Sequence, residues 1–152
     1  MQIENKQKII TKYLDGSKRR AGIVVARWNN EVTDKLLESA LETLDKCKLD
    51  KKNIKVVSVA GAVEIPFVLH KMAKSKKYDF LVAIGCVIKG DTPHFDYVCK
   101  MAQEGALRVM IEDNMPVGFG VLTLNHINQA GIRGHVGGEA ALAALELSLI
   151  KI

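Results

Sequence analysis

Aromatic residues are scarce in this chain of 152 residues: Phe, Trp and Tyr together make up 5% of it, and there is a single Trp. Lys and Arg outnumber Asp and Glu by 22 to 17, but the basic residues are scattered and do not alternate with aromatic ones. This pattern argues against a surface that stacks nucleic-acid bases and favours a solvated basic surface. A mild positive field could still attract anionic small molecules. The three cysteines form no CxxC pair, so neither a disulfide framework nor a zinc site is indicated.

Long apolar runs are also absent. The longest, Phe80 to Ile88, is too short for a helix that crosses a membrane. The first residues lack the apolar core of a secretion signal, so cytoplasmic residence is expected. Apolar residues (48%) and charged residues (26%) are in the usual range for a globular protein. The length suits a single domain, which we place at 21–152 after an N-terminal extension over 1–20.

Short apolar runs alternate with helical patterns along the chain. The predicted strands are Ala21–Ala26, Ile54–Ala60, Phe80–Cys86 and Val117–Thr123. The predicted helices are Asn29 to about Cys47, Glu64–Ser75, His94–Asp113 and Val136–Ile150. This order predicts an α/β fold in which a four-stranded parallel sheet has helices on both faces. So small a sheet has edges to protect, and the N-terminal segment could therefore pair with a neighbouring subunit.

Parallel sheets bind ligands beyond the carboxyl ends of their strands, so the residues that follow each predicted strand are the candidates for a site. The stretch Lys89–His94 follows the third strand, with Thr92 as the expected N-cap and Pro93 as the first helical residue. Free amides at such a helix start form an anion site, and His94 could move a proton near neutral pH. A plain strand-to-helix turn explains the spacing equally well.

Three further residues at strand ends are candidates, each with a simpler alternative. Glu64 would direct a carboxylate towards the strand ends, although an acidic residue also suits a first helical turn. Trp28 could stack on a heteroaromatic ring or simply pack within its loop. Arg133 lies in a glycine-rich connection and suits a phosphate or a carboxylate, or is an exposed loop charge.

Other conspicuous residues favour a structural interpretation. Cys86 could line a cleft but is better explained as small apolar packing. Phe119 lies inside a predicted strand, where core packing is expected. The spacing of His70, His126 and His135 does not suit a shared metal ion.

Five short motifs, in their order and separation, resemble the 6,7-dimethyl-8-ribityllumazine synthase family. They are Ala26-Arg-Trp-Asn29, Gly61-Ala-Val-Glu-Ile-Pro66, Tyr78-Asp79, Gly85-Cys-Val-Ile-Lys-Gly90 and His94-Phe-Asp-Tyr-Val98. The resemblance extends from about Ala21 to the C-terminus. It implies a flavodoxin-like three-layer sandwich whose subunits form homopentamers with each active site between two neighbours. In some members twelve pentamers form a hollow shell. The resemblance also implies riboflavin synthase as a possible protein partner.

The resemblance also implies a reaction. A transferase of this family condenses 5-amino-6-(D-ribitylamino)uracil with 3,4-dihydroxy-2-butanone 4-phosphate to 6,7-dimethyl-8-ribityllumazine. Phosphate and water leave, and the product enters the last step of riboflavin biosynthesis. The resemblance implies small-molecule substrates without a cofactor or a metal, and no nucleic-acid or membrane partner.

Most of the implied site residues would hold the first substrate. Trp28 would stack on the pyrimidine ring, and His94 would shuttle protons. The pyrimidine and its ribityl chain would be held by Ala62, Val63 and Glu64, and the uracil edge by Cys86, Val87 and Ile88.

The remaining implied residues would hold the phosphate or come from a neighbour. Asp91 and Thr92 would offer backbone amides to the phosphate. Phe119 and Arg133 would come from the adjacent subunit, with Arg133 pairing with the phosphate. The connection after Arg133 is shorter than in many members, and Gly137 stands about where a phosphate-side lysine is often found.

Three other functions remain alternatives. A non-catalytic flavin- or lumazine-binding relative would keep Trp28 and Glu64 but could dispense with His94 and Arg133. A signalling domain of the response-regulator kind would need acidic residues after the first strand and an aspartate after the third, where Cys86 and Val87 stand instead. Nucleic-acid binding would show a strongly salt-dependent affinity.

Overall fold

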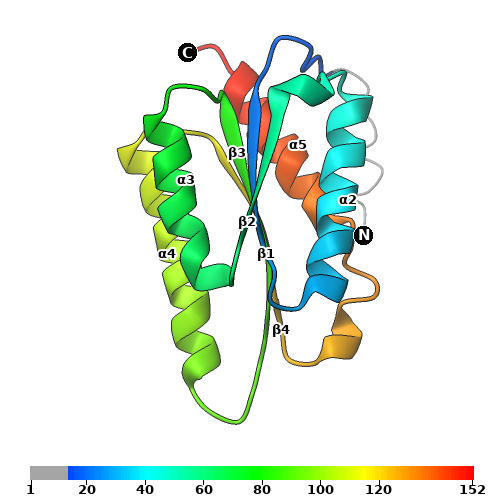
Figure 1. Ribbon diagram of the computed structural model, residues 1–152, viewed down its shortest axis with the longest axis vertical. Helices are drawn as coiled ribbons and strands as arrows, with labels where there is room; N and C mark the ends of the chain where they lie inside the picture. Colours follow the sequence, from blue (N-terminus) through cyan, green and yellow to red (C-terminus); the bar gives the residue numbers. More distant parts are fainter. Residues whose placement is uncertain (1–13) are drawn as a thin grey trace.

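The structure is a computed structural model, and it describes residues 14–152. Its strands and helices alternate in the predicted order (Figure 1). They are β1 (Ala21–Ala26), α2 (Asn30–Lys46), β2 (Ile54–Val59), α3 (Ile65–Lys74), β3 (Phe80–Ile88), α4 (His94–Glu112), β4 (Val117–Leu124) and α5 (Val136–Leu149). Short 3-10 turns lie at Lys51–Asn53, Ala62–Glu64 and Ile127–Gln129. The main difference from the prediction is that β3 continues to Ile88, two residues beyond its expected end.

The four strands form one parallel sheet in the order β2-β1-β3-β4. Helices α3 and α4 cover one face of this sheet, and α2 and α5 cover the other (Figure 1). The predicted three-layer α/β sandwich is confirmed. Right-handed crossovers explain the arrangement, because the chain turns back from β2 to β3 across β1 and so places its next helices on the opposite face.

Burial of the strands follows their place in the sheet. All six residues of β1 are buried, and so are Phe80 to Val87 of β3, because helices cover both faces of these central strands. In contrast, Lys55, Val56 and Ser58 of β2 are exposed at the sheet edge. The N-terminal segment predicted to pair with a neighbouring subunit lies, over residues 1–13, outside the described residues.

Close contact between α2 and α5 depends on a glycine in the first turn of α5. A Cβ atom added to Gly137 would overlap the carbonyl oxygen of Leu36 in α2 and lie 2.6 Å from its carbonyl carbon. Both atoms belong to backbone, so no side-chain rotation can relieve the overlap. The pair of glycines that the sequence shows at this helix start therefore allows two helices to touch.

We expect Gly137→Ala to lower the free energy of unfolding by about 1–3 kcal/mol, the usual cost of overpacking a dense interior. Guanidinium unfolding at a fixed chain concentration measures this change. Gly134→Ala is the matched control, because no atom other than those of the glycine and its chain neighbours lies within 4 Å of its added Cβ. Equal stability of the two variants would contradict the packing role.

Candidate functional site

The centre of the sheet has an open end where β3 extends past β1. β1 pairs with β3 as far as Val25 and Ile84, whereas β3 pairs with β4 up to Ile88 and Leu124. Cys86 to Ile88 therefore have a partner strand on one side only. The order in which strands are added to the sheet also reverses between β1 and β3, and open α/β sheets bind ligands at such a point.

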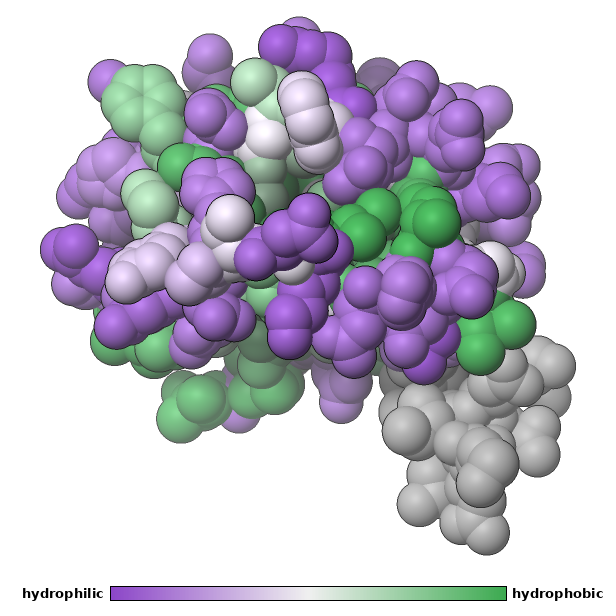
Figure 2. Space-filling view, turned by 90° about the horizontal axis from the view of Figure 1, so that it is seen from below, coloured by the Kyte–Doolittle hydropathy of each residue, from purple (hydrophilic) through white to green (hydrophobic). Residues whose placement is uncertain are grey.

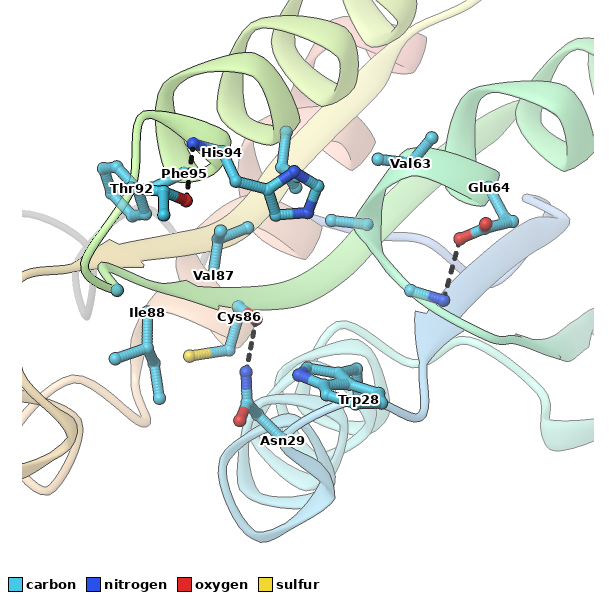
Figure 3. Close-up of a pocket in the computed structure, with 14 residues that line it drawn as sticks. Trp28, Asn29, Val63, Glu64, Cys86, Val87, Ile88, Thr92, His94 and Phe95 are labelled. Atoms are coloured by element: carbon cyan, nitrogen blue, oxygen red, sulfur yellow. Dashed lines mark hydrogen bonds between the residues drawn. The ribbon is translucent and has the colours of Figure 1, made fainter.

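A cavity of about 550 Å³ opens at this end of the sheet (Figure 3). Its volume is within the range of small-molecule sites. The lining residues come from the segments that follow β1, β2 and β3 and from the first turns of α4. They are Trp28, Asn29, Gly61, Ala62, Val63, Glu64, Cys86, Val87, Ile88, Gly90, Thr92, His94, Phe95 and Val98. Nine of the twelve residues that the resemblance implies thus lie in one pocket.

Trp28 forms one wall of the pocket. Its side chain is 75% exposed although it is the largest apolar group in the chain. Its backbone N–H donates to the carbonyl oxygen of Ala60 (3.0 Å), which ties the Trp28 turn to the segment that follows β2. A large indole that is held at a pocket and left uncovered can stack on a flat ligand.

Glu64 holds the second wall in place. Its Oε2 accepts a hydrogen bond from the backbone N–H of Gly61 (3.0 Å), across the 3-10 turn that precedes α3. This hydrogen bond satisfies an amide that the turn would otherwise leave free. Glu64 lines the pocket, and one oxygen of its carboxylate is turned onto the Gly61 amide.

The start of α4 differs from the prediction by one residue. Pro93 is the N-cap and His94 is the first helical residue, whereas we expected Thr92 and Pro93 in these places. The hydroxyl of Thr92 still accepts the backbone N–H of His94, at 3.4 Å. Pro93 has helical backbone angles (φ −65°, ψ −2°), so the difference is one of a single residue at a helix boundary, where such differences are usual.

His94 and Trp28 approach the pocket from opposite sides of β3. In Figure 3 the imidazole reaches in from α4, on the side of Val87, and the indole lies on the side of Cys86. The side chain of His94 is exposed and accessible to solvent and ligands. A flat ligand on the indole would therefore lie within reach of a group that can accept and return protons.

Burial raises the pKa of the Cys86 thiol to about 11. The thiol is therefore neutral near pH 7 and is a poor nucleophile. This agrees with the prediction that Cys86 packs as a small apolar residue while it lines the cleft.

We expect iodoacetamide to label Cys86 slowly, because a pKa two units above the ordinary value of 9.0 makes the thiolate about a hundredfold scarcer near neutral pH. Peptide mass spectrometry of labelled protein measures the rate, with the unfolded chain as the control. The rate should still be rising between pH 9 and pH 10. A rate that levels off near pH 9 would contradict the buried, neutral thiol.

Three of the implied site residues do not line this pocket. Asp91 is exposed in the loop between Gly90 and Thr92. Phe119 is 39% exposed on the edge strand β4. The guanidinium of Arg133 donates from Nη1 to the backbone carbonyl of Gln129 (2.6 Å), within the connection that precedes α5.

Five lining residues, Asn29, Gly61, Gly90, Phe95 and Val98, are not among the site residues that the resemblance implies. By sequence, Asn29 suits a helix cap, and Phe95 and Val98 fit the buried face of the helix predicted over 94–113. The core prediction is partly right, since both side chains are half-buried and pack on the cluster beneath α3 and α4. Because α4 extends past the sheet, its first turns serve the core and the pocket together.

The fold gathers basic residues that are scattered along the sequence. The segments that precede the strands or follow the last helix are 14–20, 46–53, 74–79, 113–116 and 150–152, at the upper end in Figure 1. They hold eleven Lys and Arg against four Asp. The basic residues are Lys18, Arg19, Arg20, Lys46, Lys48, Lys51, Lys52, Lys74, Lys76, Lys77 and Lys151. The positive field of the described chain therefore lies at the end opposite the pocket.

The pocket end of the molecule is different in charge. The segments 27–31, 60–64, 89–96 and 125–139 hold three basic and five acidic residues. Figure 2, which views this end from below, shows hydrophobic side chains in separate patches on a hydrophilic surface. Capture of an anion here must therefore depend on nearby groups, such as helix-start amides or a single Arg.

Two further features are absent from the part of the chain that the structure describes. Residues 14–152 contain no group of three or more His, Cys, Asp or Glu side chains arranged to hold a metal ion. None of the helices described combines the length and the apolar character that crossing a membrane requires.

Comparison with known proteins gives a consistent result. A family model described as 6,7-dimethyl-8-ribityllumazine synthase matches residues 18–151. A protein of that name from Desulfovibrio desulfuricans is 44% identical over 144 residues, which cover 91% of this chain and 92% of the relative. Another of that name, from Desulfatibacillum aliphaticivorans, is 45% identical over 139 residues, with 88% and 90% covered.

Proposed function

The chain belongs to the 6,7-dimethyl-8-ribityllumazine synthase family, and from this membership we propose that it catalyses the reaction of that name. It is then a transferase of riboflavin biosynthesis that acts on small molecules. It joins 5-amino-6-(D-ribitylamino)uracil to 3,4-dihydroxy-2-butanone 4-phosphate, and it releases the lumazine, inorganic phosphate and water. Cytoplasmic residence stays a prediction.

One observation supports the proposal above the others: Trp28 and His94 face a single pocket from the two sides of β3. The indole offers a surface on which the pyrimidine stacks. The unpaired side of β3, at Cys86 to Ile88, offers backbone groups to the uracil edge. Ala62, Val63 and Glu64 complete the opposite wall, where Glu64 takes hydroxyl groups of the ribityl chain.

The chemistry needs placement and proton transfer. The 5-amino group of the uracil attacks the ketone, water leaves to form a Schiff base, phosphate is eliminated, and the ring closes with loss of a second water. Holding two flexible substrates in one geometry can contribute about 7–11 kcal/mol to lowering the barrier. His94 acts as the catalytic acid and base in the proton transfers, a contribution of about 10²–10⁴-fold in rate.

The phosphate binds at the start of α4. The amides around Asp91 and Thr92 face it, and the partial positive charge of the helix start favours an anion there. The side chain of Asp91 then points to solvent, in agreement with its exposure. Arg133 and Phe119 come from the adjacent subunit, which accounts for their absence from the lining of this chain's own pocket.

The shared site requires a homo-oligomer, and we propose a pentamer. Support comes from the large apolar side chains that the described chain leaves exposed on α3 and α4. These include Phe67 and Tyr97 at 67%, Met101 at 54% and Ile111 at 71%. Such surfaces are usual at subunit contacts. Assembly of pentamers into a hollow shell and association with riboflavin synthase are further proposals.

We expect the purified protein to form the lumazine and inorganic phosphate in equal amounts when both substrates are supplied. Lumazine absorbance and a phosphate assay follow the two products. His94→Ala should slow turnover about 10²–10⁴-fold without abolishing it. His126→Ala, an exposed histidine outside the pocket, is the control and should match the parent. Lumazine binding without turnover by the parent would instead indicate a non-catalytic relative.

Arg133→Ala should raise the Michaelis constant for the phosphorylated butanone, because it removes a cation that pairs with the phosphate. The Michaelis constant for the uracil should change little. Arg20→Ala is the control, since Arg20 pairs with Asp79 at the end of the molecule opposite the pocket.

Mixing subunits tests whether neighbours share a site. Equal amounts of His94→Ala and Arg133→Ala chains are unfolded together and reassembled. If each site takes His94 and Arg133 from different subunits, random assembly leaves about a quarter of the sites intact, and activity rises accordingly above that of either variant. Activity that stays at the mean of the two separate variants would contradict the shared site.

A further inference from the structure

Asn29 stands at the start of α2 in an unusual way. An Asn at the N-cap ordinarily has extended backbone, and its side chain accepts an amide of the first helical turn. Here the backbone is left-handed, with φ 62° and ψ 46°, and the side chain makes no capping hydrogen bond within the described residues. The Asn29 side chain, which lines the pocket, therefore does not cap its own helix, and this indicates a different role for it.

The side chain reaches β3 instead. Its Nδ2 donates to the backbone carbonyl of Cys86 at 2.9 Å, in a partly buried contact (Figure 3). β1 has already ended at Ala26, and its pairing with β3 stops at Val25 and Ile84. The amide therefore adds one hydrogen bond to the open side of β3, beyond the last backbone pairing.

This hydrogen bond connects two walls of the pocket. Asn29 directly follows Trp28, whose indole lies beside it in Figure 3. The indole is mostly exposed, so little side-chain packing fixes its position. The position of the indole relative to β3 depends instead on the backbone turn, which is tied to Ala60 at one end and through Asn29 to Cys86 at the other.

We propose that Asn29 is a positioning residue for the pyrimidine: its side-chain amide sets the width of the slot between the indole of Trp28 and the free edge of β3. The inference deepens the proposed function and rests on it. The left-handed backbone contributes to this positioning, because it turns the side chain of Asn29 away from its own helix and towards β3.

Three variants separate the effects of the left-handed backbone, the amide donor and an added charge. Asn29→Gly keeps a residue that tolerates the left-handed backbone but removes the amide. Asn29→Asp keeps the shape but replaces the donor with an acceptor, which repels the carbonyl of Cys86. Asn30→Asp is the matched control, since it introduces the same charge one residue away, on an exposed side chain outside the pocket.

The first readout is kinetic. We expect Asn29→Gly and Asn29→Asp to raise the Michaelis constant for 5-amino-6-(D-ribitylamino)uracil about five- to tenfold, the loss expected for one hydrogen bond. The Michaelis constant for the butanone and the melting temperature should change little. The Asn30→Asp control should match the parent. A merely structural role would instead lower the melting temperature and leave both Michaelis constants unchanged, which would overturn the proposal.

The second readout needs no substrate. Trp28 is the only Trp, so the fluorescence anisotropy decay of the ligand-free protein reports the motion of this indole alone. The decay should show a wider local motion in Asn29→Gly than in the parent and in Asn30→Asp. Equal motion in all three proteins would overturn the inference even if the enzyme is active. An inactive parent with a freed indole in Asn29→Gly would instead refute the proposed function and leave the positioning role supported.

Discussion

The structure depends on the absence of a strand beside the last residues of β3. Once β1 ends, Cys86 to Ile88 keep β4 as a partner but have no strand on the other side. Backbone groups at that edge need partners, because unpaired polar groups are costly when they are shielded from water. The carbonyl of Cys86 accepts a hydrogen bond from Asn29. The remaining backbone groups at this edge lie at a cavity that a heterocycle with its own donors and acceptors can fill.

The walls of the pocket follow from the same open edge. Each wall is the first segment after a strand, so the sheet fixes its position, and each is locked by a contact outside regular secondary structure. Trp28 is tied to Ala60 and Gly61 to Glu64, while His94 begins the helix that covers the opening. Sites carried on such segments keep the precision of the sheet beneath them.

Much of this could be predicted from the sequence. Continuous apolar runs gave the order of strands and helices, and the end of each strand placed Trp28, Glu64 and His94 at one edge. Other features could not be predicted. The left-handed turn at Asn29 depends on a contact with Cys86, which is distant in the sequence, and the cap of α4 depends on whether Thr92 or Pro93 leaves the helix.

The charge distribution also required the fold. Basic residues spread over five segments meet at one end because parallel strands bring all their preceding connections together. The motifs imply that Phe119 and Arg133 serve a neighbour's site, but an isolated chain leaves both outside its own pocket.

The proposed catalysis requires that a flat ring stacks on Trp28 in the pocket at the open edge of β3. The most direct measurement is a titration of Trp28 fluorescence with 6,7-dimethyl-8-ribityllumazine, corrected for absorption by the ligand. We expect saturable quenching that ends at one ligand per chain. Quenching that never saturates, or a ligand that binds and leaves the fluorescence of Trp28 unchanged, would contradict it.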